Sequence, residues 1–283
     1  MVAQSKLRSR SIVLRTRGQQ YGPITRLVSP NNIGELIKPF VFLDSIQMES
    51  TFGEGFGWHP HSGIATLTII YEGDSTFEES TGKKGEMHAG DIEWMLAGGG
   101  VWHTAAPLIA SEQYQRVRGY QLWLALPPQL ENTTAHSVHI KAADILINGP
   151  ARVILGKYGD AHSSIDYPAN ITYLDVSLKA GEHWSFKPEV GQNVAWVAIQ
   201  CSEVQTIEKI AQGELVVFAE SDQVINFLAI TDTRFVLGSA EKHPFELVLG
   251  HYSVHTSVKA LEIGEAGIRM SRSQLQRSAI IDE

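Results

Sequence analysis

The chain has 283 residues, of which 43% are hydrophobic and 19% charged, and its formal net charge is −8 at pH 7. This length predicts two domains of ordinary size, and the hydrophobic share suffices for packed cores rather than a disordered chain. The negative net charge argues against direct nucleic-acid binding, which usually needs a basic surface.

The cysteine count and the N-terminal segment indicate the compartment. The single cysteine, Cys201, excludes an internal disulfide framework and fits a reducing environment. It lies in an apolar stretch, residues 195–201, and is expected to be a buried thiol. Residues 1–17 are basic but lack the apolar core of a signal peptide, and no stretch has the apolar length of a membrane helix. We therefore expect a cytoplasmic protein that does not bind membranes.

Short β-type segments, separated by Gly, Pro, Asp and Asn, dominate the chain. In the first half they are Ser11–Arg17, Val41–Leu43, Ala65–Tyr71, Ser75–Glu78, Ile92–Leu96 and Tyr120–Leu126. After Pro127 and Pro128 they are Val153–Leu155, Thr172–Leu178, Ala195–Gln200, Glu214–Phe218, Asn226–Ile230 and Phe245–Gly250. Helical patterns are few, the best being Ser271–Arg277 and a weaker one Ala142–Ile147. Many short strands predict an all-β protein of two barrels, residues 1–140 and 141–283, with a short C-terminal helix.

Three of the eleven histidines form a pattern typical of a metal site. His59 and His61 flank Pro60, so in an extended strand both imidazoles point to one face. His103 follows a glycine-rich turn, residues 98–100, and enough chain lies between to return it beside the first two. Neutral imidazoles on a rigid β scaffold suit Fe, Zn, Cu, Ni or Mn. The spacing alone equally fits two histidines in a solvent-facing loop.

The order of the motifs resembles the pirin family. The resemblance rests on Phe56–Gly63, Gly90–Met95 and Gly98–His103; it extends upstream to Lys38–Asp44 and more faintly downstream to Phe245–Ser257 in the second barrel. Pirins are bicupins, so the resemblance implies two cupin-type jelly-roll barrels packed together. It also implies that the three histidines bind one divalent transition metal. Iron is the first candidate and Ni, Cu, Mn or Zn are alternatives.

This chain departs from the family in its fourth ligand. Pirins carry a glutamate two residues after the last histidine, where this sequence has Ala105, and the other acidic position of cupins is Ala65. Loss of the carboxylate raises the net charge of the site by one unit and opens a coordination position, so metal affinity should fall. Glu93 alternates with apolar neighbours and is expected to face outward. Glu54 lies in a loop that could cover the mouth but is expected to be solvated.

The remaining histidines and the tryptophans are given structural roles. His88, His136, His139, His162 and His243 are expected on the surface. His251 and His255 lie too far apart in an extended segment to bind one metal, and the second barrel is expected to be metal-free. Trp94 is expected in the core, whereas Trp58 and Trp102, each preceding a histidine, are expected in the walls of the pocket.

Three functions follow from the resemblance. The first is a metal-dependent dioxygenase acting on flavonols such as quercetin or related small aromatics. The second is a regulatory protein that binds a transcription factor or metabolic enzyme, with the metal as a redox-sensitive switch. The third is a stress-related binding module that keeps the fold without turnover, and in which the metal site has decayed into a binding pocket.

Overall fold

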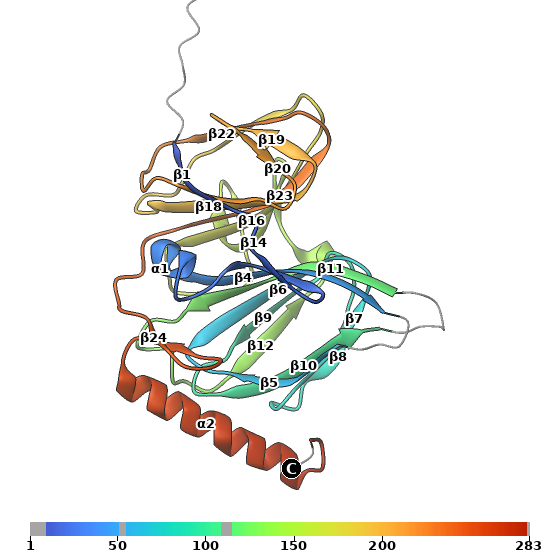
Figure 1. Ribbon diagram of the computed structural model, residues 1–283, viewed down its shortest axis with the longest axis vertical. Coiled ribbons are helices and arrows are strands. Elements are labelled where there is room, and N and C mark those ends of the chain that lie inside the picture. The colour runs from blue at the N-terminus through green and yellow to red at the C-terminus, as the bar shows by residue number, and fades with distance from the viewer. Residues whose placement is uncertain (1–9, 51–54, 109–114, 282–283) are drawn as a thin grey trace, which may run out of the picture. The chain divides into compact units, whose positions relative to one another are not determined.

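The computed structural model describes residues 10–50, 55–108 and 115–281 (Figure 1). Strands dominate these residues. Their helices are α1 (Ile33–Ile37), the 3-10 helix η1 (Ala142–Asp144) and α2 (Val258–Arg277). The prediction of an all-β protein with a C-terminal helix is confirmed, although α2 begins at Val258 rather than Ser271. Among the described residues, no helix is long and apolar enough to cross a membrane.

The chain divides into two compact units, and neither is continuous in sequence. Unit 1 contains the residues up to Gly18 and Ile145–Lys242, and unit 2 contains Gln19–Asp144 and His243–Glu283. These units differ from the predicted segments 1–140 and 141–283 at both chain ends. The N-terminal strand β1 (Ile12–Thr16) pairs with β21 (Leu215–Phe218) and so belongs to unit 1. The C-terminal segment that contains α2 (Val258–Arg277) is predicted from the sequence in the second barrel, but it belongs to unit 2 together with Gln19–Asp144.

Unit 1 consists of two antiparallel sheets. The larger has the order β1 (Ile12–Thr16), β21 (Leu215–Phe218), β18 (Val194–Cys201), β23 (Thr233–Ala240), β16 (Ile171–Leu178), β14 (Ala151–Tyr158) and β13 (Ile147–Asn148), with β15 (Ala161–His162) pairing to β14. The smaller has the order β17 (His183–Phe186), β22 (Ile225–Ala229), β19 (Glu203–Gln205) and β20 (Lys209–Ala211). Apolar side chains of both sheets form one buried core.

Unit 1 differs from the sequence prediction in its central strand and in the position of its cysteine. The central strand β23 was not predicted, although it pairs on both sides and its side chains are mostly buried. Cys201 is exposed rather than buried. It is the last residue of β18, and the ladder to β23 shifts register between Ile199 and Cys201, so the apolar alternation does not extend to it.

Unit 2 has the same construction and contains the candidate site. Its larger sheet has the order β12 (His136–Ile140), β9 (Ile92–Leu96), β6 (Ile64–Glu72), β11 (Gln115–Ala125), β4 (Phe40–Ser50), β3 (Ile24–Val28) and β2 (Gln19–Tyr21). Its smaller sheet has the order β5 (Phe56–His61), β10 (Val101–Pro107), β7 (Ser75–Glu79) and β8 (Lys84–Met87). A short hairpin, β24 (Val248–Leu249) and β25 (Val254–His255), replaces the predicted strand Phe245–Gly250.

The hairpin and α2 are attached to unit 2 through close backbone approaches. Gly63 has a positive φ of 72°, and a Cβ there would lie 2.1 Å from the carbonyl oxygen of Val254, so only glycine fits. Helix α2, red in Figure 1, packs against β10. A Cβ on Gly267 would lie 1.8 Å from the carbonyl oxygen of Gly99, so this helix touches the glycine-rich turn directly.

Replacement of Gly267 by alanine tests this contact. In an exposed helix the change would raise helix propensity by about 1 kcal/mol. Here the added methyl overlaps backbone, and overpacking of this kind costs about 1–3 kcal/mol. We expect Gly267→Ala to lower the free energy of unfolding and the Tm, whereas Gln274→Ala on the exposed face of the same helix should leave both nearly unchanged. Thermal denaturation of both variants decides it; a higher Tm for Gly267→Ala would show that α2 does not dock this closely.

Candidate metal centre

Pairing of β5 with β10 brings the three predicted histidines together. His59 lies directly opposite His103 in the antiparallel ladder, and His61 lies opposite Val101. Because directly opposed residues share a face of the sheet, and His59 and His61 are two residues apart, all three imidazoles point into the barrel. Strand β10, which carries His103, was not among the predicted strands.

The three imidazoles converge. The ring centroids of His59 and His103 are 4.3 Å apart, and that of His61 is 5.0 Å from each of the other two. One nitrogen from each ring lies within 4.8 Å of the others. His61 and His103 are buried, and His59 is half-buried. The arrangement offers three nitrogen donors to a single point.

Burial keeps these imidazoles neutral. It lowers the pKa of His61 and His103 well below the ordinary 6.5, and the neighbouring imidazoles lower it further. A contact of His61 with the Tyr252 backbone acts in the opposite direction but is smaller. Burial also lowers the pKa of His59, against opposing effects of the Gly57 carbonyl and the Glu93 charge. The neutral form is the one that binds metal.

The hydrogen bonds of the imidazoles do not occupy the nitrogens that could bind a metal. His59 Nδ1 lies 2.8 Å from the carbonyl oxygen of Gly57 and donates to it in the tautomer that leaves Nε2 as the acceptor. The Nε2 atoms of His61 and His103 are buried and make no hydrogen bond of ordinary geometry. Buried polar atoms without partners are rare, and three neutral acceptors at one point are the donor set that a transition metal requires.

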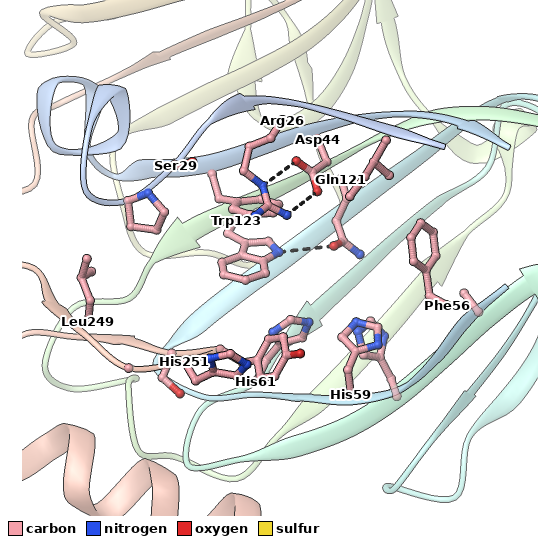
Figure 2. A pocket seen from close by; sticks show the side chains of 18 of the residues that line it. Arg26, Ser29, Asp44, Phe56, His59, His61, Gln121, Trp123, Leu249 and His251 are labelled. Atoms are coloured by element: carbon pink, nitrogen blue, oxygen red, sulfur yellow. Dashed lines mark hydrogen bonds and ion pairs between the residues drawn. The ribbon is translucent and has the colours of Figure 1, made fainter. Parts of the chain in front are cut away.

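The histidines line a cavity of about 720 Å³ (Figure 2). Aromatic side chains make up much of its wall, namely Phe42, Phe56, Trp58, Trp123 and Tyr252. Phe42 and Trp123 are stacked with ring centroids 3.9 Å apart, and the Trp123 ring meets His61 edge-on at 4.8 Å. A cavity of this size, with aromatic walls and polar side chains at fixed points, is typical of a small-molecule site.

The wall opposite the histidines carries a polar row, as Figure 2 shows for its first members. Arg26 donates two hydrogen bonds of 3.0 Å to Asp44, and its guanidinium lies 4.3 Å from the Phe42 ring centroid. Burial raises the pKa of Asp44, against the effect of Arg26. Gln121 lies beside them and accepts a hydrogen bond from Trp123 Nε1.

Strand register extends this row to Glu93. Asp44 pairs with Gln121, Gln121 with Thr68, and Thr68 with Glu93, so these four residues share one face of the larger sheet. Thr68, Gln121 and Glu93 line a second, smaller cavity, and the carboxylate of Glu93 therefore points inward. The expectation that Glu93 faces outward is wrong because Trp94, its apolar neighbour, is buried on the opposite face of the sheet. Both faces of β9 are buried.

The C-terminal segment closes one side of the larger cavity. Residues 249–253 line it, and a buried network holds them in place. Ser62 Oγ donates to Ser253 Oγ at 2.8 Å and lies 3.0 Å from His255 Nε2. His255 Nδ1 lies 3.3 Å from Glu131, which also accepts from the backbone and hydroxyl of Thr256. The hairpin that supplies Tyr252 to the cavity is thus tied to the residue that follows His61.

Two of the remaining positions named in the sequence analysis line the cavity, and one does not. Ala105 lines the cavity with the histidines, so the missing carboxylate would have faced them. Trp58 lies in the cavity wall as predicted. Trp102 instead faces α2 and donates from Nε1 to the Ile268 carbonyl. Glu54 lies outside the described residues.

Two histidines expected on the surface are not fully exposed. His243 is buried, and burial lowers its pKa to about 4, aided by the charge of Lys38. His139 is half-buried and lies 3.4 Å from a Glu93 oxygen. His139 lies on β12, where the alternation of polar residues does not indicate which face is covered, and His243 lies outside the strands, so no sequence signal marks either residue.

Comparison with known proteins places the fold and the motifs in a family. The family model Pirin matches residues 23–124. The crystal structure of quercetin 2,3-dioxygenase from Acinetobacter baumannii has a TM-score of 0.83 at 24% identity, covering 94% of this chain and 98% of that one. Bacterial pirin YhhW in complex with nickel(II) from Escherichia coli has a TM-score of 0.64 at 20% identity, covering 83% and 96%. The predicted fold of two cupin-type barrels is confirmed.

The sequence relationship is closer for a pirin-like protein of Caulobacter vibrioides. It is 31% identical over 216 residues, which cover 72% of this chain and 75% of that protein. Together with the match of the family model, this relative shows that the chain belongs to the pirin family.

Proposed function

We propose that His59, His61 and His103 bind one divalent transition metal. The observation that carries this proposal is the convergence of three neutral imidazoles, two of them, those of His61 and His103, buried with Nε2 atoms that have no protein partner. Imidazole suits Fe, Ni, Cu and Zn, and the bacterial pirin YhhW was crystallised with nickel(II). With Ala105 in place of a carboxylate, the site is a three-histidine centre and leaves more positions open than a four-ligand one.

We further propose that the protein is a metal-dependent dioxygenase acting on flavonols or related small aromatics. The similar structure from Acinetobacter baumannii is a quercetin 2,3-dioxygenase. The cavity of this chain suits a flavonol, because its aromatic walls favour a planar ring system and the three histidines lie in its lining. When bound, the metal would supply Lewis acidity and redox capacity to a substrate in this cavity.

The side chains of the cavity would orient such a substrate. The stacked rings of Phe42 and Trp123 offer a flat apolar surface, and Tyr252 lies on the side that the C-terminal hairpin covers. Arg26, held by Asp44, and Gln121 offer hydrogen bonds to hydroxyl or carbonyl groups at the wall opposite the histidines. The aromatic walls and the hairpin on one side of the cavity would also limit water at the reacting atoms.

The first prediction from this proposed function concerns turnover of quercetin. Purified protein loaded with Fe(II), Ni(II), Cu(II) or Mn(II) should bleach quercetin in air with at least one of these metals. His61→Ala and His103→Ala should each weaken metal binding by at least about 100-fold, because even a change of a residue behind a ligand costs about 10–100-fold. Bleaching should fall in parallel. His162→Ala, an exposed histidine of unit 1, is the matched control.

Two results would overturn parts of this proposal. Wild-type protein that binds metal but bleaches no flavonol would favour the regulatory or binding role over catalysis. Unchanged metal affinity in the His61→Ala and His103→Ala variants would remove the metal site itself.

The second prediction concerns position 105. Ala105 lines the cavity with the histidines, so a carboxylate introduced there can replace a water on a dication. Ala105→Glu should tighten metal binding by about tenfold or more. Ala105→Gln, which adds similar volume without the charge, should gain much less. Metal titration of the three proteins at one pH measures the effect, and equal affinities would show that another residue already supplies a carboxylate.

The third prediction concerns pH. For three imidazoles with the ordinary pKa of 6.5, the fraction with all three neutral falls roughly 1000-fold between pH 7.5 and 5.5. Burial lowers the pKa of all three here, so protons compete with the metal only at lower pH. We expect the metal Kd to change less than about tenfold over this range. Titration in non-coordinating buffers tests it, and a loss near 1000-fold would mean that the imidazoles are solvated.

A further inference from the structure

We propose that Glu79, Glu93 and His139 form a second divalent-cation site in unit 2, separate from the three-histidine centre. One carboxylate oxygen from each glutamate and one imidazole nitrogen lie within 4.8 Å of one another. The proposal goes beyond the dioxygenase function and does not depend on it.

The strands place these side chains at the same point from both sheets. Glu93 on β9 and His139 on β12 are directly opposed in the larger sheet. Glu79 ends β7 in the smaller sheet, opposite His103. The ring of Phe77 stacks on the His139 ring with centroids 3.8 Å apart, which holds the imidazole in orientation. Two carboxylates and an imidazole thus meet where the two sheets approach.

The donor atoms are buried and lack partners. Glu79 is 2% exposed and Glu93 4%, and in each the Oε1 atom makes no hydrogen bond. His139 Nε2 makes none either, and its contact with Glu93 at 3.4 Å lies within the cluster. The other oxygen of Glu79 accepts from Thr81 at 2.7 Å and Ser137 at 2.9 Å, so its free Oε1 is held in a fixed position. Buried carboxylate oxygens left unpaired in this way call for a ligand.

The charge of the cluster calls for a cation. Among the described residues, no lysine or arginine forms an ion pair with Glu79 or Glu93. Lys83 is close by but donates its ammonium to the Ser137 carbonyl. Two buried carboxylates near one another repel and lose hydration, and a divalent cation would balance both charges.

The donor set selects the kind of cation. Two carboxylate oxygens with one imidazole suit a first-row metal such as Mn²⁺, Fe²⁺ or Zn²⁺, whereas Ca²⁺ and Mg²⁺ prefer oxygen ligands throughout. Glu93, the member of the cluster closest to open space, lines a cavity of about 40 Å³ together with His103. This cavity shares Ala105 and Gln121 with the larger one, so the Glu93 side of the cluster lies next to the space around the three histidines.

The experiment counts Mn²⁺ bound to the full chain by electron paramagnetic resonance, in which free and bound Mn²⁺ give distinct signals. The His59→Ala/His61→Ala variant removes the first site and should still bind one Mn²⁺ per chain. In Glu79→Gln/Glu93→Gln, which keeps the side-chain shapes, binding at the second site should weaken by at least about 100-fold. Glu78→Gln, the neighbouring carboxylate of β7 on its other face, should keep it.

The proposal stands if the His59→Ala/His61→Ala variant still binds Mn²⁺ and if adding Glu79→Gln/Glu93→Gln to that variant abolishes the binding. It is overturned if His59→Ala/His61→Ala binds no Mn²⁺, a result that needs no glutamate variant and so does not depend on its folding. It is also overturned if Glu79→Gln/Glu93→Gln leaves binding in the histidine-substituted chain unchanged. Circular dichroism of each variant confirms that the sheets are intact.

Discussion

Antiparallel pairing of β5 with β10 is the interaction on which the chemistry of unit 2 depends. It sets His59 opposite His103 and aims both into the barrel with His61. A shift of the register by one residue would turn the imidazoles to the other face of the sheet. The register is supported on both sides of β10, since β7 pairs with its other edge and places Glu79 opposite His103. The two candidate ion sites therefore rest on the same strand.

The barrel interior separates two kinds of polar group. The imidazoles of the smaller sheet are neutral because burial and their mutual proximity disfavour a positive charge. The larger sheet presents a row that runs from the Arg26–Asp44 pair through Gln121 and Thr68 to Glu93. Arg26 compensates the charge at one end of the row, whereas at the other end no arginine or lysine among the described residues pairs with Glu93, and His139 lies 3.4 Å from it. This asymmetry makes the Glu93 end attractive to a cation, while the aromatic middle suits an uncharged ring.

The C-terminal segment completes the cavity although it is distant in sequence. Its attachment depends on glycines where two backbones come too close for a side chain. Gly63 lies against the Val254 carbonyl, and Gly267 lies against the Gly99 carbonyl. The buried Ser62–His255–Glu131 network adds polar anchoring next to His61. This network resembles a nucleophile with its base in composition, but all three side chains are buried and Ser62 is engaged by Ser253, so it serves to position Tyr252 and its neighbours.

The sequence by itself determined the all-β class, the presence of a C-terminal helix and the family, and it predicted that His59, His61 and His103 come together. Periodicity and the order of these motifs are local properties of the chain. It also showed that position 105 lacks a carboxylate. Only the tertiary structure decided which side of each strand is covered. The sequence predicts solvent exposure for Glu93 and His139, because alternation defines two faces of a strand but does not say which one encloses a cavity. In β9 both faces are buried, and in β12 the imidazole of His139 lies against Glu93. The same reason applies to Cys201, where a shift in register ends the alternation. Membership of the compact units was likewise decided by long-range strand pairing and helix packing, which no local pattern in the chain encodes.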